Sequence, residues 1–525
     1  MSVVLFYSFY AAFLFVPLKE SIHMLQQNRY QRERYRTWLK EAFSSKQRAI
    51  QLRFLSLLPL WLMVFALHLT VYPYLWYLCI AVYAYLYIKA DQKKEYIKKI
   101  VFTHRAKRLF FIHTLCSVSL LYLMSVCFNP LLYILCMPFL YFIPWVLLCF
   151  TAQLCEPLEQ WIKNSYVQDA KKILAKRDDL IKIGITGSYG KTSVKHILHT
   201  VLSEEYYAYM TPHSYNNLMG LTISIRTQLN ALHQVLIAEM GADHVGEIDE
   251  LACFIQPSVA VITAVGPQHL STFHTQENIL NEKMRLVERL PFHGTAVLNY
   301  DNELIRSYPL SHFVNRITYG IHYEDADVRA TQIHYSTKGT HFTILYPGGA
   351  FAVETVLLGE HNVLNILAAA ATALSMKIAP EQIIAAVKRL RYVEHRLEVR
   401  KMGNYTLLDD AYNSNPQGAG YALDVLAAMP NKRFLLTPGF LDLGEQTKMA
   451  HIAYAKKMCR CADEILLIGK KQTHDIYDTL IEQAYPLEHI HACESTKEAF
   501  ALLQRLALPG DCALIENDLP DAFNH

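Results

Sequence analysis

A glycine-bracketed turn followed by lysine and threonine lies within IGITGSYGKTS, residues 183–193. Gly187 and Gly190 stand between an apolar run and a segment with helical spacing, a geometry that directs backbone N–H groups and a helix N-terminus at an anion. Lys191 can reach the outer phosphates of a nucleotide, and the Thr192 hydroxyl suits Mg²⁺. The strict spacing G-x-x-x-x-G-K-[ST] fails because isoleucine occupies the first glycine position. An ordinary strand–helix turn therefore stays open as the alternative to a phosphate-binding loop.

Two more residues follow apolar runs that indicate neighbouring strands. Glu239 ends the run VLIAE, and His269 follows VITAVGPQ. In a parallel sheet the carboxyl ends of the strands lie at the same edge as the phosphate loop. A carboxylate and an imidazole at that edge can hold a metal ion on a nucleotide. A lone histidine is more often structural, and its place after such a strand is what makes His269 a ligand candidate.

Short β-rich runs alternate with longer helical runs after residue 180, a pattern typical of a parallel sheet that helices cover on both faces. The first set of expected strands reads IKIGIT, HQVLIAEM, SVAVITAV and GTAVLNY. Residues 327–357 alternate with turn residues and predict antiparallel strands at one edge, before a helical pair at 363–376 and 380–390. A second alternating set begins with YTLLDDAY, which indicates a second α/β domain after a boundary near 391–395.

Three earlier stretches contain no Asp, Glu, Lys or Arg: residues 1–18, 54–88 and 109–155. A helix that crosses the hydrocarbon core of a bilayer needs about 20 apolar residues, and about 17 still suffice. We therefore expect an α-helical membrane domain of about five spans. The expected spans cover residues 3–18, 54–70, 72–89, 109–127 and 131–152.

The loops between these spans predict the orientation of the chain. Residues 19–53 contain nine lysines and arginines against three acids, and residues 89–108 contain eight against two. Because basic loops stay on the cytoplasmic side, we expect a multi-pass protein of the cell membrane with its N-terminus outside and the α/β domains in the cytoplasm. A cleaved signal peptide is the alternative for residues 1–18, and it is disfavoured because no basic residue precedes the apolar run.

The net charge of the chain is +3 at pH 7, and the basic excess is concentrated in those two loops, where anionic membrane lipid would attract it. The remainder is therefore acidic, which argues against nucleic acid as a partner. There are eleven cysteines, and Cys459-x-Cys461 lacks a second pair. A zinc site is therefore not indicated.

These segments, in this order, resemble the Mur ligase family, and most closely its MurF type. The resemblance covers about residues 180–525 and rests on GITGSYGKTS, SYNNLMGLT, EMGADHVGEIDEL, ITAVGPQHL, LNYDN, GEHNVLN, EHR, DDAYNSNP and GFLDLGE. It implies a P-loop parallel-sheet ATPase domain at 181–392 and a C-terminal Rossmann-like α/β domain at 393–525. An amphipathic linker at 156–180 would join them to the membrane region 1–155.

The resemblance implies roles for individual residues. Asn362 and Asn365 match adenine contacts, Arg396 an arginine that reaches the γ-phosphate, and Asp410 a residue that holds the ribose. The ATP-binding set is then Gly187, Ser188, Gly190, Lys191, Thr192, Ser193, Asn362, Asn365, Arg396 and Asp410.

The resemblance also implies two Mg²⁺ ions. Thr192 and Glu239 would serve the first ion, and His269 with Lys283 the second. Lys283 matches a lysine that becomes carbamylated, which turns a cation into an anion able to support a metal; a solvated helix lysine is the alternative. The expected catalytic residues are Lys191, Glu239, His269, Lys283 and Arg396.

Four asparagines are candidates for substrate contact: Asn216, Asn217, Asn413 and Asn415. For Asn216 and Asn217 the alternative is local capping of the backbone. At the C-terminus, Glu516, Asn517 and Asp518 stand where the MurF type has a Lys-Gly-Ser-Arg-like turn close to the incoming amine. Such an acidic turn either favours a more cationic amine or is simply surface.

The MurF type joins D-alanyl-D-alanine to UDP-MurNAc-tripeptide, and it begins with a small UDP-binding domain where this chain has its apolar region. We therefore expect a membrane-anchored ATP-dependent amide ligase of peptidoglycan precursor synthesis. It would activate a muropeptide carboxylate as an acyl phosphate and join it to an amino acid or a D-Ala-D-Ala-like dipeptide amine. Two alternatives stay open: the same chemistry on a lipid-linked or other anionic acceptor, and a non-catalytic ATP-binding membrane scaffold.

Overall fold

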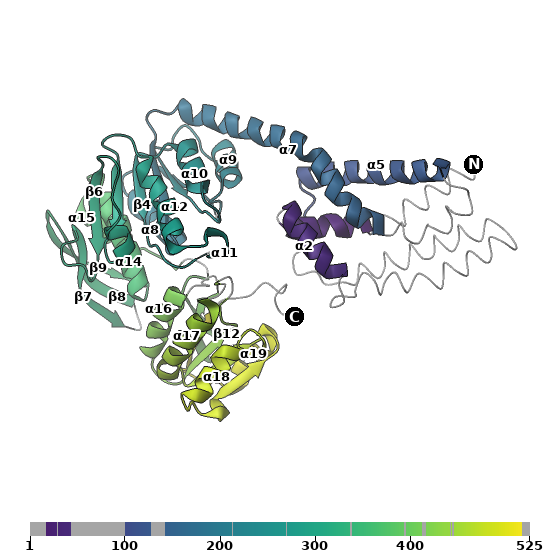
Figure 1. Cartoon of the computed structure of the whole chain (residues 1–525). Coiled ribbons are helices and arrows are strands. Elements are labelled where there is room, and N and C mark those ends of the chain that lie inside the picture. The colour runs from purple at the N-terminus through teal and green to yellow at the C-terminus, as the bar shows by residue number, and fades with distance from the viewer. Residues whose placement is uncertain are drawn as a thin grey trace. The chain divides into compact units, whose positions relative to one another are not determined.

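The computed structural model describes residues 17–28, 30–43, 100–127, 142–212, 214–268, 270–336, 339–392, 395–411, 416–440, 443 and 446–516. The chain divides into two compact units, Met1–Ser165 and Tyr166–His525. Figure 1 labels their helices and strands. The predicted spans 54–70 and 72–89 lie outside the described residues.

The second unit begins with a nine-stranded sheet in the order β2-β3-β1-β4-β5-β6-β7-β8-β9. The strands are β1 (Ile181–Thr186), β2 (Ala208–Met210), β3 (Val235–Glu239), β4 (Val259–Ile262), β5 (Thr295–Asn299), β6 (Asn315–Gly320), β7 (Val328–Ser336), β8 (Gly339–Tyr346) and β9 (Gly349–Thr355). Strands β2 to β7 pair in parallel, whereas β7, β8 and β9 pair antiparallel. The parallel sheet with an antiparallel edge is confirmed.

Helices cover both faces of this sheet because its central strands are apolar on both sides. Val235 and Ile237 of β3 face one buried cluster, and Leu236 and Ala238 face the other. The covering helices are α8 (Lys191–Leu202), α9 (Leu218–Thr227), α10 (Glu247–Ile255), α11 (Leu270–Phe273), α12 (Gln276–Glu288), α13 (Glu303–Arg306), α14 (Glu360–Ser375) and α15 (Pro380–Lys388).

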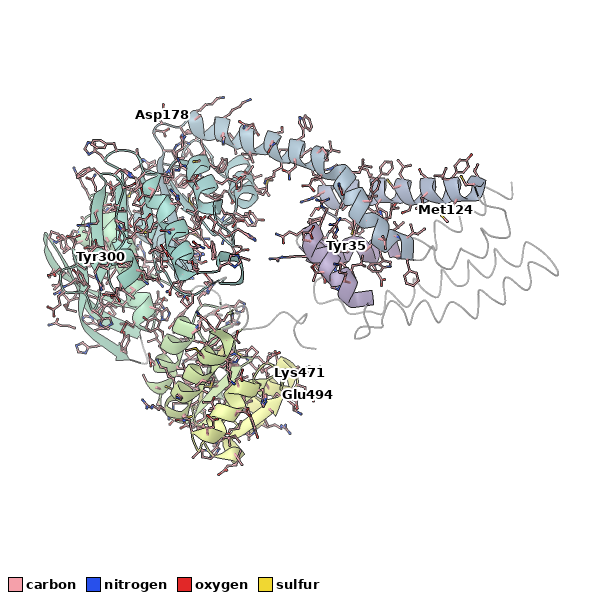
Figure 2. All side chains as sticks on the ribbon, viewed as in Figure 1. Tyr35, Met124, Asp178, Tyr300, Lys471 and Glu494 are labelled. Atoms are coloured by element: carbon pink, nitrogen blue, oxygen red, sulfur yellow. The ribbon has the colours of Figure 1, made fainter. Side chains whose placement is uncertain are left out.

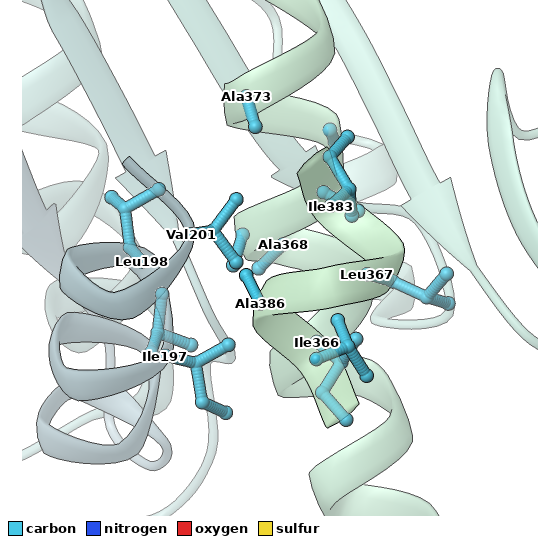
Figure 3. Close-up of a cluster of buried hydrophobic side chains, with 14 of the residues drawn as sticks. Ile197, Leu198, Val201, Ile366, Leu367, Ala368, Ala373, Ile383 and Ala386 are labelled. Atoms are coloured by element: carbon cyan, nitrogen blue, oxygen red, sulfur yellow. The ribbon is translucent and has the colours of Figure 1, made fainter. Parts of the chain in front are cut away.

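Helices α8 and α14 pack closely because α14 presents a run of buried alanines. Ile197 and Val201 of α8 lie against Ala368 of α14 in the same cluster (Figure 3). Small side chains let the two helix backbones approach, so the start of α14 lies near the start of α8. This contact brings the segment GEHNVLN to the phosphate loop.

A second, six-stranded sheet follows in the order β10-β11-β15-β12-β13-β14. Its strands are β10 (Glu398–Met402), β11 (Tyr405–Asp410), β12 (Arg433–Thr437), β13 (Glu464–Ile468), β14 (Ile490–Cys493) and β15 (Cys512–Glu516). Only β10 pairs antiparallel among these described strands. Its helices are α16 (Pro416–Ala427), α17 (Thr447–Cys461), α18 (His474–Glu482) and α19 (Thr496–Leu506), with a short 3-10 helix at Leu487–His489. The domain boundary at 392/393 stays a prediction.

The first unit is helical where it is described, with α2 (Arg32–Phe43), α5 (His104–Cys127) and the start of α7 (Ile143–Ala175). Tyr35 is buried in it and donates a hydrogen bond to the carbonyl of Trp145 at 3.0 Å (Figure 2). In the described part of the chain one helical segment, His104–Met124, is long and apolar enough to cross a membrane, judged by length and composition alone. It overlaps the predicted span 109–127.

Helix α7 covers two segments that the sequence suggested were separate. The part of the predicted span 131–152 from Ile143 on and most of the linker 156–180 share this one helix, which continues through Pro157 and ends at Ala175; residues 131–141 lie outside the described residues. The apolar and the amphipathic stretches both have helical spacing, and one proline removes only a single backbone hydrogen bond. The boundary at 155 is therefore a change of composition within a helix.

Candidate nucleotide-binding site

The phosphate loop joins the end of β1 to the start of α8. Gly190 caps α8 with a φ of 81°, and a Cβ atom there would lie 2.6 Å from Oδ1 of Asn365. Glycine is therefore required by both the backbone conformation and the close approach of α14. Gly187 also has positive φ and packs against Thr263. A loop of this kind offers backbone N–H groups and a helix N-terminus to a phosphate.

Lys191 lies inside this loop. Its Nζ donates hydrogen bonds to the carbonyls of Gly187, at 2.5 Å, and Ser188, at 3.2 Å. Burial lowers the pKa of Lys191 from 10.5 to about 8, with the Arg396 guanidinium adding to the effect and the Glu239 carboxylate opposing it. The ammonium is thus held where phosphate oxygens would compensate its lost hydration.

Glu239 ends β3 directly beside the loop, since it is in register with Ile185 of β1. Its Oε1 accepts hydrogen bonds from the Thr192 hydroxyl and the Asn216 amide, both at 3.2 Å. The structure therefore brings together Thr192 and Glu239, the two residues expected at the first Mg²⁺. Carboxylate and hydroxyl oxygens beside a phosphate site suit Mg²⁺, so this pair fits the ion.

Lys195 is a member of this site that sequence reasoning missed. Its Nζ lies 3.0 Å from Oε2 of Glu239, and neither side chain reaches solvent. The signal was a lysine one turn after Lys191 on a helix face otherwise made of Val194, Ile197 and Leu198. A charge on an apolar face requires a partner, and the carboxylate of Glu239 is that partner.

Lys283 lies on α12 and is almost fully buried. Burial, with the positive charge of Lys191 adding to the effect, lowers the pKa of Lys283 from 10.5 to about 7. The neighbouring Glu282 accepts hydrogen bonds from the backbone N–H groups of Gly246 and Ile248, which fixes α12 against the start of α10. The solvated helix lysine that was the alternative is therefore wrong. His269 lies outside the described residues.

The segment that leads to His269 is fastened to the phosphate loop. The backbone N–H of Ser188 donates to the carbonyl of Ala264 at 2.7 Å, and the Ser188 hydroxyl contacts the backbone of Gly266. The Tyr189 hydroxyl donates to the carbonyl of Pro267 at 3.1 Å. The loop and the end of β4 thus form one hydrogen-bonded piece.

The residues expected at the adenine lie at the start of α14. Asn362 donates to the carbonyl of Leu358 at 2.8 Å, and Asn365 lies against Gly190. Next to Asn362 on α14, the half-buried His361 ring stacks on Tyr421 of α16 with centroids 5.9 Å apart. Burial and the Arg396 charge lower the pKa of His361 to about 4, so the ring is neutral.

The positive charge of Arg396 contributes to lowering the pKa of both Lys191 and His361. Its contact with the γ-phosphate stays a prediction. Asp410 is buried, and its Oδ1 accepts a hydrogen bond from the Leu397 N–H at 2.9 Å. Asn413 and Asn415 lie outside the described residues.

Two asparagines have local hydrogen-bond partners, and the C-terminal acid Glu516 is buried. Asn217 caps α9 by accepting from the Gly220 N–H, and Asn216 bonds to Glu239. Capping, the alternative to substrate contact, is therefore what Asn217 does here. Glu516 has no exposed surface and faces Asp410 across paired strands, so the surface interpretation is wrong for it. Asn517 and Asp518 lie outside the described residues.

Comparison with known proteins places these features in a family. Residues 185–373 match the Mur ligase middle domain, and residues 395–516 match the Mur ligase glutamate ligase domain. Two solved structures share the fold at low identity. MurF from Thermotoga maritima in complex with ADP has a TM-score of 0.62 and 23% identity, covering 68% of this chain and 80% of that one. MurF from Acinetobacter baumannii has a TM-score of 0.60 and 24% identity, covering 68% and 77%.

Curated relatives carry the name UDP-N-acetylmuramoyl-tripeptide–D-alanyl-D-alanine ligase. The protein from Escherichia coli strain K12 is 31% identical over 303 residues, covering 56% of this chain and 65% of that protein. The protein from Bacillus subtilis strain 168 is 30% identical, with 58% of its length covered. The chain thus spans less than two thirds of these two relatives. The protein from Mycobacterium tuberculosis strain CDC 1551 is 32% identical over 358 residues, covering 64% of this chain and 69% of that protein. The chain belongs to the Mur ligase family.

Proposed function

We propose that the chain is an ATP-dependent amide ligase of MurF type in peptidoglycan precursor synthesis. The observation that carries the proposal is the cluster of Lys191, Thr192 and Glu239 at one sheet edge, in which Lys191 interacts electrostatically with Lys283 and Arg396. Lys191 and Arg396 suit the phosphates of ATP, Thr192 and Glu239 suit the Mg²⁺ that accompanies them, and the mechanism assigns none of these groups to attack the substrate. Such a site favours phosphoryl transfer between substrates by positioning and charge neutralisation.

The reaction has two steps. A substrate carboxylate oxygen attacks the γ-phosphorus of ATP, the bond to the β-phosphate oxygen breaks, and ADP leaves. The amine then attacks the acyl carbon, phosphate leaves with the C–O electron pair, and the amine loses one proton. Lys191 and the loop N–H groups hold the β- and γ-phosphates, and Arg396 stabilises the charge on the transferred group. Bound Mg²⁺ would neutralise phosphate oxygens beside Thr192 and Glu239.

Lys283 would serve this site as a carbamate, near a second Mg²⁺. Carbamylation needs the neutral amine, and a pKa of about 7 provides it near neutral pH. Beside Lys191 a carbamate anion would replace a cation–cation repulsion with an attraction. His269 remains the proposed partner of Lys283 at this ion.

For the substrates, the names of the relatives favour a UDP-linked muramoyl tripeptide and D-alanyl-D-alanine. A lipid-linked muropeptide is the second candidate acceptor, because charge-free stretches precede the ligase domains. We infer a multi-pass membrane location with the N-terminus outside and the catalytic domains in the cytoplasm, near anionic lipid. The apolar helix His104–Met124 supports it, with Phe111, Leu115 and Leu123 exposed.

The test is amine-dependent ADP release by the full chain in nanodiscs, with UDP-linked and lipid-linked muropeptides and a panel of amines. Turnover with the UDP-linked tripeptide and D-Ala-D-Ala supports the MurF assignment. Turnover with lipid-linked acceptors alone would replace it with the second candidate. ATP binding without turnover on any acceptor would favour a scaffold. Lys191→Ala is the matched inactive control.

A further inference from the structure

The turn that carries Arg396 has an unusual backbone. His395 has a φ of 57° and Leu397 a φ of 49°, so Arg396 stands between two left-handed residues that are not glycine. Such conformations are unfavourable for side chains with a Cβ and persist only where neighbouring contacts hold them. The contacts that hold this turn therefore decide where the guanidinium points.

Two consecutive carboxylates at the end of β11 make hydrogen bonds to the turn, one on each side of Arg396. Nδ1 of His395 lies 2.9 Å from Oδ2 of Asp409, and the N–H of Leu397 donates to Oδ1 of Asp410 at 2.9 Å. Both acids are almost fully buried, and Leu397 is completely buried. The residue before Arg396 is thus held through its side chain, and the residue after it through its backbone.

We propose that Asp409, acting through His395, is a positioning residue that aims Arg396 at the γ-phosphate of ATP. The proposal rests on the proposed function, which gives Arg396 its phosphate. Asp410 supplies the second grip on the same turn. Because the charge of Arg396 already reaches Lys191 and His361, a small rotation of this turn would move the guanidinium away from the phosphate loop.

A purely structural role for Asp409 is the competing explanation. Its Oδ2 also lies 3.3 Å from an Nη atom of Arg400, and Arg400 pairs with Glu398 of the same strand. This second contact fastens β10 to β11, and Glu398 also accepts a hydrogen bond from the His395 N–H at 3.3 Å. Arg400→Gln removes the ion pairs of Arg400 and leaves the acceptors of both His395 hydrogen bonds in the protein, which makes it the matched control.

The decisive measurement separates γ-phosphate binding from nucleotide binding. Isothermal titration of the full chain in detergent gives the dissociation constants of ADP and of a non-hydrolysable ATP analogue, each with Mg²⁺. We expect Asp409→Ala and His395→Ala to bind the analogue at least about fivefold more weakly while ADP binding changes less than twofold. His395→Asn, whose amide can still reach Asp409, and Arg400→Gln retain the wild-type ratio.

A double-mutant cycle completes the test. Arg396→Gln should lose the preference for the analogue. Arg396→Gln/Asp409→Ala should lose no more, because both substitutions remove the same contact between Arg396 and the γ-phosphate. Loss of the preference in Arg396→Gln but not in Asp409→Ala would overturn the positioning role alone. An unchanged preference in Arg396→Gln would overturn the phosphate contact and the positioning role together. Asp409→Asn, which keeps the shape of the side chain, replaces Asp409→Ala if the Tm of the latter is too low for the titration.

Discussion

The buried pair of Lys195 and Glu239 makes a sharp prediction about stability. Lys195→Met removes the ammonium that lies 3.0 Å from Oε2 of Glu239 and leaves a carboxylate with almost no exposure. Breaking a buried ion pair by removing one partner costs about 3–5 kcal/mol, because the remaining charge is uncompensated. For a domain of about 150–250 residues each kcal/mol lowers Tm by about 2–4 °C, so we expect a loss of roughly 6–20 °C.

Nucleotide should reverse part of this loss. A Mg²⁺ ion beside Thr192 and Glu239 would compensate the same carboxylate, so the ion and a non-hydrolysable ATP analogue raise Tm more in Lys195→Met than in the wild type. The assay is thermal unfolding by circular dichroism of the full chain in detergent, with and without the ligand.

Two comparisons decide the outcome. Lys195→Met/Glu239→Gln should be more stable than Lys195→Met, because replacing both charges is far less costly than stranding one. Lys470→Met, which breaks an exposed pair with Glu494 at 3.6 Å, should change stability by less than about 1 kcal/mol. A Lys195→Met protein as stable as Lys470→Met would refute the reasoning.

Two further changes test the loop and the C-terminal strand. Gly190→Ala should weaken binding of the ATP analogue about 5- to 30-fold, since a left-handed alanine costs roughly 1–2 kcal/mol and its Cβ would meet Asn365. The calorimetric control is Gly403→Ala, because Gly403 also has positive φ but has open space around it. This control should bind the analogue normally. Burial and the Asp410 carboxylate raise the pKa of Glu516 well above 4.5, so the folded state retains this proton while the unfolded state loses it. Stability then falls as pH rises above the unfolded value, by up to about 1.4 kcal/mol per pH unit. Glu516→Gln should remove that slope in urea titrations between pH 5 and 8, and an identical slope in both proteins would contradict the burial argument.

The sequence predicted the elements whose signal is local. Apolar runs gave the parallel strands, and alternation with turn residues gave the antiparallel edge at 327–357. The pairing of Thr192 with Glu239 followed because the carboxyl ends of parallel strands share one edge. These inferences need only that the strands run parallel, which the alternation of apolar runs and helical segments indicates.

Other features depend on contacts that no local pattern contains. The carboxylate of Glu239 decides that Lys195 is a buried ion-pair partner, and the two lie 44 positions apart in the printed sequence. The grip of Asp409 on His395 depends on the left-handed turn around Arg396, and nothing in EHRLE announces positive φ at a histidine or a leucine. Glu516 was assigned to the acidic turn after the last strand, because no residue type in the sequence marks where that strand ends.

Lys283 gives a prediction that tests the site without turnover. At its ordinary pKa of 10.5, about one lysine in three thousand is neutral at pH 7, whereas a pKa of about 7 makes about half of Lys283 neutral. Only the neutral amine attacks CO₂, and carbamate formation releases a proton, so carbamylation should increase from pH 6 to pH 8. The measurement is the ¹³C carbamate resonance of the full chain with ¹³C-bicarbonate, with Lys283→Arg as the control.

The same electrostatics predict an order of events. Lys191 lowers the pKa of Lys283 because two ammonium groups repel, and a bound triphosphate would reverse that effect by adding negative charge. An ATP analogue added before bicarbonate should therefore slow the growth of the carbamate signal, whereas the analogue added afterwards should leave the signal in place. A signal that persists in Lys283→Arg, or one that is equal at pH 6 and pH 8, would contradict this account. Carbamylation should therefore precede nucleotide binding, because without the triphosphate the positive charge of Lys191 adds to the effect of burial in lowering the pKa of Lys283.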